Sequence, residues 1–257
     1  LLKHDSDIAG RDEVNNSRWG IAPSIAFGLN GPLQLIASHY HLETDDLPDA
    51  GGFPYADPVA KTTTGRPLVP DRNNFYGLVD RDFQRTRADI STLDASYDLG
   101  GHKLRNVARL GNTSNDYLWT QPDDSKNNPN LYGTLWRRTN SRAIDTKTFA
   151  DQLSLTGAFQ TGALKHSYSA GVEYSDEKMT RGSYLMTPGT SNPLTGNSKC
   201  PTTGAATGYN CTDFANPNPH DPWAATHPVT RSDKALDIEQ TTVTKSVYAF
   251  DTIELSE

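Results

Sequence analysis

Strict alternation of apolar and polar residues marks the stretch from Ala163 to Ser175. One set of alternate positions carries the less polar and aromatic side chains, Leu164, His166, Tyr168, Ala170, Val172 and Tyr174. The other set is polar or small: Lys165, Ser167, Ser169, Gly171, Glu173 and Ser175. A period of two predicts a β-strand with one apolar side and one polar side.

The same pattern recurs along the chain. After a strand end and a polar loop in residues 1–17, clear alternation starts at Arg18, although Pro23 interrupts it and cannot donate to a strand ladder. Further strands are predicted at about 33–44, 86–99, 103–110, 146–159 and 237–254. With the central stretch, these make about seven antiparallel strands in up-and-down order.

The connections between these strands are short and long in turn. Glycine-containing turns are predicted at 28–31, 100–102 and 160–163. The other connections are long polar loops at 45–85, at 112–137 and after the strand at 164–175. An aromatic residue lies shortly before each short turn, at Phe27, Tyr97 and Phe159, as expected of rings at a membrane interface.

We therefore expect an all-β fold, an antiparallel up-and-down segment of a transmembrane β-barrel with short periplasmic turns and long extracellular loops. Loops of this length are unusual inside a compact soluble domain. The alternative is a soluble β-sandwich, which would have turns at short regular intervals and no systematic alternation of loop length.

Composition agrees with a barrel more than with a conventional globular core. Only 35% of the 257 residues are apolar. The sequence has no apolar run long enough for a transmembrane helix, but a spanning strand needs only about ten residues, half of them polar. A net charge of −7 argues against nucleic acid as a partner. Because the sequence begins with Leu1 and has no signal peptide, we expect a fragment of a longer protein.

Two cysteines, Cys200 and Cys211, lie in the same Gly/Thr/Asn/Pro-rich loop. A loop of this length closes readily into a disulfide, and no CxxC motif or histidine-rich context favours a metal or redox pair. We therefore predict a disulfide and an oxidising compartment. The alternative is two free thiols in a cytosolic protein.

Several stretches resemble the β-barrel of TonB-dependent siderophore receptors of Gram-negative outer membranes, especially the catecholate branch. They are DIAGRDEVNNSRWGIAPSIAFGL (7–29), SHYHLETDDLPDAGGFPYA (38–56), DRNNFYGLVDRDF (71–83), CPTTGAATGYNCTDFANPNPHDPW (200–223) and KSVYAFDTIELSE (245–257). The resemblance implies a 22-stranded barrel with an N-terminal plug. Residues 1–257 would then be part of the barrel domain, with the plug and the remaining strands absent.

The resemblance also implies a function, which is the import of a ferric siderophore, of catecholate type, across the cell outer membrane. The implied partners are the ferric siderophore, the TonB–ExbB–ExbD system acting through the missing plug, and outer-membrane lipid. Two alternatives stay open: a receptor of this architecture for haem, cobalamin or a glycan, and a soluble all-β binding module such as a lectin-like domain.

No enzyme is expected. The sequence has no Gly-x-Ser-x-Gly elbow, no phosphate-binding glycine loop and no zinc signature. We expect no resident cofactor and no protein-bound metal, since iron would travel as the ferric siderophore. His39 and His41 would share one strand face and could hold a metal, but two half-exposed strand residues near an interface is the favoured interpretation.

The candidate ligand-binding residues are aromatic and cationic residues of the long loops and of the segment after the central strand. A ferric catecholate is an anion surrounded by aromatic rings, so its binder needs flat apolar faces and guanidinium groups. The candidates are Tyr55, Phe75, Tyr76, Tyr117, Trp119, Trp136, Arg137, Arg138 and Tyr184. The alternative is that these side chains pack the loops against one another or form the outer aromatic belt.

Overall fold

The computed structural model describes residues 1–50, 71–123, 133–186, 211–220 and 229–255. The chain is almost entirely β-structure in these ranges. Its elements are β1 (Leu2–Asp7), β2 (Asn15–Ile21), β3 (Ser24–Phe27), β4 (Leu33–Leu47), β5 (Phe83–Asp98), β6 (His102–Asp123), β7 (Thr134–Thr161), β8 (Leu164–Gly182), β9 (Tyr184–Met186), β10 (Cys211–Asp213), β11 (Val229–Arg231), the short 3-10 helix η1 (Lys234–Leu236) and β12 (Ile238–Glu254).

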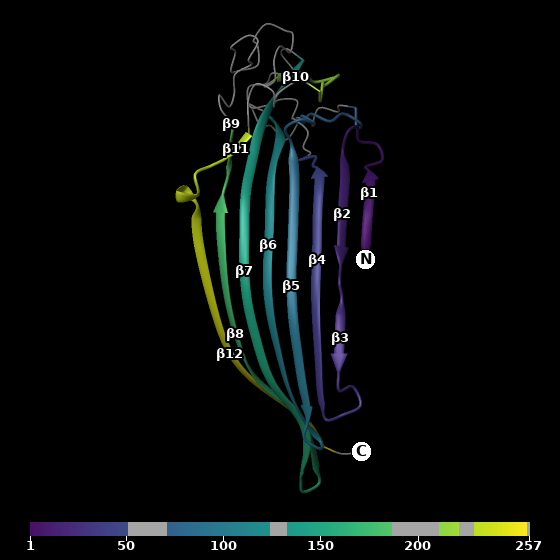
Figure 1. Cartoon of the computed structure of the whole chain (residues 1–257), viewed down its shortest axis with the longest axis vertical. Coiled ribbons are helices and arrows are strands. Elements are labelled where there is room, and N and C mark those ends of the chain that lie inside the picture. Colours follow the sequence, from purple (N-terminus) through teal and green to yellow (C-terminus); the bar gives the residue numbers. More distant parts are fainter. Residues whose placement is uncertain (51–70, 124–132, 187–210, 221–228, 256–257) are drawn as a thin grey trace.

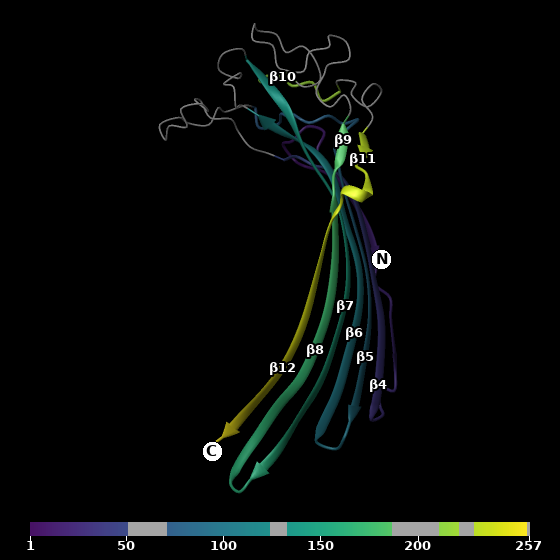
Figure 2. The same ribbon diagram turned by 90° about the vertical axis from the view of Figure 1, so that its left-hand side faces the viewer.

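One antiparallel sheet contains all the long strands, in the order β1-β2-β4-β5-β6-β7-β8-β12. β3 continues the line of β2 along β4, β10 pairs with β7, and β9 and β11 form a separate small sheet. Strands that follow one another in the sequence lie side by side (Figure 1), and they curve along their length instead of lying flat (Figure 2). The predicted up-and-down order is confirmed.

The described sheet is open, with β1 and β12 at its two edges. Among the residues that the structure describes, no helix is long and apolar enough to cross a membrane.

The three short turns lie where the sequence predicts them. Gly28 has φ +70° and its carbonyl accepts a hydrogen bond from Gly31 N at 2.9 Å. Gly100, Gly101 and Gly162 also have positive φ, which glycine adopts without steric penalty. The long connections leave from the opposite end of the sheet (Figure 1).

Pro23 falls in a gap between β2 and β3 and does not disturb the register. Ile21 pairs with His41 before the gap and Ser24 pairs with Ser38 after it, so the two short strands face β4 in one continuous register. The Pro23 carbonyl still accepts a hydrogen bond from His39 N at 3.0 Å. The proline therefore removes one donor without shifting the pairing.

The predicted loop at 112–137 is wrong in extent. β6 continues to Asp123 and β7 begins at Thr134, and the two pair without interruption up to Asp123 and Trp136. These upper strand segments are largely polar on both faces, so they lack the alternation that marks the lower segments. The alternation of apolar and polar residues thus predicts where the strands lie but not where they end on the side of the long loops.

The register divides the sheet into two faces of different chemistry. The face that we name the apolar face carries a band of exposed apolar side chains on every long strand, including Leu33, Leu93, Tyr97, Leu104, Leu110, Phe149, Leu153, Val172 and Val247. The opposite face, the polar face, carries Asp94 and Arg105 in an ion pair, with Nε 3.0 Å from Oδ1. It also carries Gln152, which donates to Glu173 at 2.7 Å.

The apolar band has the height of a membrane core. On β7 it extends over eleven residues, from Phe149 to Phe159, and ten steps of about 3.3 Å at a tilt of about 40° give roughly 25 Å. Phe27, Tyr97 and Phe159 all lie on this face near the short turns and are 58%, 43% and 47% exposed. They occupy the positions predicted for an aromatic belt.

Candidate functional site

Two of the predicted ligand-binding residues stack on each other on β6. The ring centroids of Tyr117 and Trp119 are 4.5 Å apart with an angle of 25° between the planes. Both residues have the strand parity of Arg105, so they continue the polar face above the level of the apolar band. In a closed barrel whose apolar face contacts lipid, this face lines the interior.

Arginines of β7 lie beside this aromatic pair. Arg142 pairs in register with Tyr117, and Arg138 pairs with Gln121, two residues beyond Trp119 on the same face. Arg138 is one of the residues that the sequence predicts for the site, whereas Arg142 is not among them. The register between β6 and β7 brings Arg142 to this surface, and the sequence alone gives no such register.

Phe75, Tyr76 and Arg137 are buried, with exposed fractions of 2%, 5% and 2%. The Tyr76 hydroxyl donates to the Phe214 carbonyl at 2.7 Å, and Arg137 Nε donates to the Tyr76 carbonyl at 2.9 Å. Burial raises the pKa of the Tyr76 phenol. These side chains fasten two loop segments to the top of β7, as in the packing alternative given above.

A buried ion pair fixes the same loop to β6. Arg81 Nε donates to Asp82 Oδ1 at 2.7 Å, and both side chains are fully buried. The second oxygen of Asp82 accepts from Thr120 N at 2.8 Å and from Leu78 N at 3.4 Å. These donors satisfy both oxygens of the buried Asp82 carboxylate in the absence of solvent.

Tyr184 does not join the stacked pair. Its ring meets Phe83 edge-on at 5.3 Å, and Phe83 lies on the apolar-face side of β5. Burial, with a smaller contribution from Asp116, raises the pKa of the Tyr184 phenol.

Tyr55 and Cys200 lie outside the described residues, as do the side chains of Trp136 and Cys211. The predicted disulfide therefore stays a prediction, as does ligand contact by the nine candidates.

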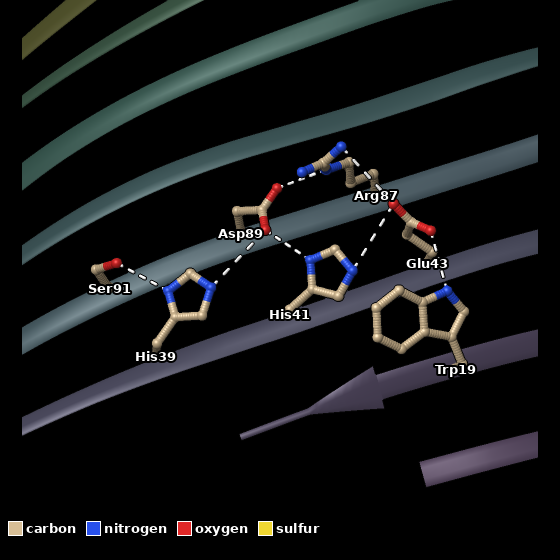
Figure 3. Close-up of polar contacts among 7 residues, drawn as sticks. All are labelled: Trp19, His39, His41, Glu43, Arg87, Asp89 and Ser91. Carbon is tan, nitrogen blue, oxygen red and sulfur yellow. Dashed lines mark hydrogen bonds and ion pairs between the residues drawn. The ribbon is translucent and has the colours of Figure 1, made fainter. Parts of the chain in front are cut away.

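His39 and His41 belong to a polar cluster of seven residues (Figure 3). The register places them on the apolar-face side, next to the apolar band toward the long loops. His41 Nδ1 donates to Asp89 Oδ1 at 2.6 Å, and Arg87 Nε donates to the other oxygen of Asp89 at 2.6 Å. Trp19 Nε1 donates to Glu43 at 3.0 Å. We name Trp19, His39, His41, Glu43, Arg87, Asp89 and Ser91 the outward cluster.

The histidines of this cluster make hydrogen bonds within the sheet. His39 Nδ1 lies 2.9 Å from Ser91 Oγ, and the His41 ring is 4.5 Å from the Trp19 ring. Within the described part of the chain, no group of three or more His, Cys, Asp or Glu residues has a metal-holding arrangement. His39 is partly exposed, in keeping with an interfacial strand residue, whereas His41 is buried and not half exposed, because it packs against Trp19 and Asp89.

Long antiparallel strands, a lipid-height apolar band, short turns at one end and long loops at the other define a segment of a transmembrane β-barrel. No protein-family model matches the chain. Among curated proteins it is 37% identical, over its whole length, to the probable TonB-dependent siderophore receptor PiuA of Acinetobacter baumannii. It is 30% identical, over 96% of its length, to the catecholate siderophore receptor Fiu of Escherichia coli K12.

Solved structures of the same two receptors agree. The crystal structure of the PiuA receptor matches 99% of this chain with a TM-score of 0.82 at 36% identity. The open form of the ferric-catecholate import receptor Fiu matches 99% with a TM-score of 0.77 at 27% identity. The chain is a homologue of TonB-dependent siderophore receptors, and its sheet corresponds to part of their barrel. It spans about a third of their length, 34% of the curated PiuA sequence and 31% of Fiu.

Proposed function

We propose that the chain is part of an outer-membrane receptor that imports a ferric siderophore, of catecholate type, by TonB-dependent active transport. The observation that carries the proposal is the match of the whole chain, in sequence and in structure, to the siderophore receptor PiuA. Because the chain spans about a third of that receptor, the function belongs to the complete protein.

The catecholate assignment is supported by the chemistry of the polar face. The stacked rings of Tyr117 and Trp119 offer a flat aromatic surface, and Arg138 and Arg142 supply positive charge on the same face. Aromatic stacking and guanidinium hydrogen bonds together suit an anion surrounded by catechol rings.

The proposed activity is transport and not catalysis, with iron carried as the chelated cargo. The proposed partners are the ferric siderophore, outer-membrane lipid around the apolar face, and the TonB–ExbB–ExbD system, which would act through a plug domain.

The test is a ligand titration of the full-length receptor that contains this chain, purified in detergent. Intrinsic Trp and Tyr fluorescence is followed during titration with a ferric catecholate and, separately, with a ferric hydroxamate. Saturable quenching by the catecholate at submicromolar concentration, without a response to the hydroxamate, is the expected result. A response to neither would contradict the substrate proposal and favour haem or glycan import, while leaving the barrel fold unaffected.

A further inference from the structure

A depression of about 620 Å³ lies in the apolar face directly below the outward cluster. Small side chains from three adjacent strands, Ala37, Ser91 and Ala108, contribute to its lining, with Leu93 directly between Ala37 and Ala108 in the register. Larger apolar side chains flank them: Ile25, Leu93, Leu110 and Phe149. The volume is in the range of small-molecule sites, and the lining is almost entirely apolar.

The depression is at the upper edge of the lipid-facing band, toward the long loops. His39 lines it and also belongs to the outward cluster. Because long loops mark the external side of such barrels, this position corresponds to the external leaflet. The depression is continuous with the apolar face, which contacts acyl chains in the membrane. The ligand that we expect in it is therefore an acyl chain of a lipid.

Above the depression, a second hollow of about 300 Å³ is polar. Arg85 and Arg87 line it, and their side chains are 61% and 57% exposed. Asp45 and Asp89 each accept from the Nε of one of these arginines, at 3.2 Å and 2.6 Å. The Nη1 atom of Arg87 lies 3.7 Å from Glu43 Oε1. Each guanidinium group carries five N–H donors, so both arginines keep donors for a further acceptor.

We propose that these two hollows bind one phosphorylated lipid of the external leaflet. An acyl chain occupies the depression over Ala37, Ser91 and Ala108, and the phosphate of the head group accepts hydrogen bonds from Arg85 and Arg87. Arginine suits this role because its planar fork matches phosphate oxygens. Trp19, 42% exposed at the same height, provides the amphipathic ring that favours the membrane interface.

The acidic residues around the arginines set the selectivity of the head-group site. Glu43, Asp45 and Asp89 hold the guanidinium groups in place, and Asp116, which pairs in register with Arg85, adds a further carboxylate to the lining of the hollow. Together these carboxylates oppose an anion that carries no acyl chain. A phosphate therefore binds well only when its acyl chain is seated below. Acyl chain and phosphate are both required, and this requirement separates the proposal from simple attraction of anions.

The test uses the full-length receptor, purified and stripped of lipid in detergent. Native mass spectrometry then follows the binding of phosphatidylglycerol and of a diacylglycerol with the same acyl chains. Ala108→Phe fills the depression, and Ala170→Phe adds the same ring on the apolar face outside it. A double variant, Arg85→Gln with Arg87→Gln, removes the phosphate donors. Retention of heat-modifiable mobility on gels shows that each variant is folded.

One phosphatidylglycerol is expected to bind the unmodified receptor, with affinity lowered about tenfold or more in Ala108→Phe and unchanged in Ala170→Phe. The arginine variant should weaken phosphatidylglycerol binding to the level of the diacylglycerol. Equal binding to the unmodified receptor and to Ala108→Phe would overturn the site. Equal binding of the two lipids to the unmodified receptor would overturn the phosphate contact.

Discussion

The Tyr248 side chain covers Gly171 on the polar face of the sheet. A Cβ added at Gly171 would lie 2.6 Å from the Tyr248 hydroxyl oxygen and 2.7 Å from the Leu153 carbonyl oxygen. The tyrosine hydroxyl in turn accepts from Gln152 Nε2 at 3.1 Å. The absent side chain at one position therefore makes room for a ring that connects β12, β8 and β7.

Gly171→Ala is expected to destabilise the barrel by about 1–3 kcal/mol, because the ring must move and the contact with the backbone carbonyl cannot relax easily. Urea unfolding of the full-length receptor in liposomes measures the change. Gly111→Ala is the matched control, since its Cβ would make only an ordinary 3.8 Å contact with Thr148. Equal stability of the two variants would contradict the role given to Tyr248.

Trp119→Ala is expected to weaken binding of a ferric catecholate about tenfold, because it removes one partner of the stacked pair on the polar face. Fluorescence titration of the full-length receptor gives the affinity. Trp19→Phe is the control, since Trp19 lies on the opposite face of the sheet. A larger loss of affinity in Trp19→Phe than in Trp119→Ala would rule out the polar face as the binding surface.

Asp82→Ala is expected to release the loop 71–82 from β6, since it removes the buried carboxylate bonded to Arg81 and Thr120. Breaking a buried pair by removing one partner typically costs about 3–5 kcal/mol. Hydrogen exchange of residues 71–82 should become faster. In the control Asp45→Ala, the lost pair with Arg85 is exposed and exchange of this loop should not change. Unchanged exchange in Asp82→Ala would show that other contacts hold the loop.

The loop contact through Tyr76 should weaken at alkaline pH. Burial raises the pKa of this phenol above the unfolded value of about 10, so the folded state holds the proton more tightly. Its contribution is therefore complete below about pH 10 and is lost as the pH rises through the folded-state pKa. A phenolate also cannot donate to the Phe214 carbonyl.

Limited proteolysis of the external loops across this pH range tests the expectation. The unmodified receptor should become more sensitive as the pH rises. Tyr76→Phe lacks both the hydroxyl and its titration, so it should be more sensitive at neutral pH and change less with pH. The same alkaline increase in both proteins would assign the effect to other groups.

The strands could be predicted where their two faces meet different solvents. Between Leu164 and Tyr174 every second side chain faces lipid, and the sequence shows this as an alternation of apolar and polar residues. Above the membrane, loop segments cover one face of β6 and β7 and bury apolar and polar residues alike, such as Leu118 and Thr120. The upper parts of these strands therefore have no such alternation, and the sequence predicts a loop there.

The candidate site could be predicted in composition but not in arrangement. Tyr76 and Trp119 are equally suitable aromatic residues in a sequence. Tyr76 is buried through Phe214, which lies 138 residues further along the chain. Trp119 lies on the polar face because of the register of β6 with its neighbours. Such long-range contacts leave no local pattern in the sequence. A prediction based on residue type therefore names both Tyr76 and Trp119 as ligand-binding candidates.

Val172→Arg tests the assignment of the apolar face to lipid. Val172 is half exposed at the middle of the band on β8. An arginine there would face the hydrocarbon core and should destabilise the folded barrel by about 2–4 kcal/mol. Ser169→Arg is the matched control, because it places the same side chain on the polar face of the same strand. Urea unfolding of the full-length receptor in liposomes should show a large loss of stability for Val172→Arg and a small one for Ser169→Arg. The reverse order would mean that the apolar face lies inside the barrel, and it would remove the basis for both the lipid site and the interior position of Trp119.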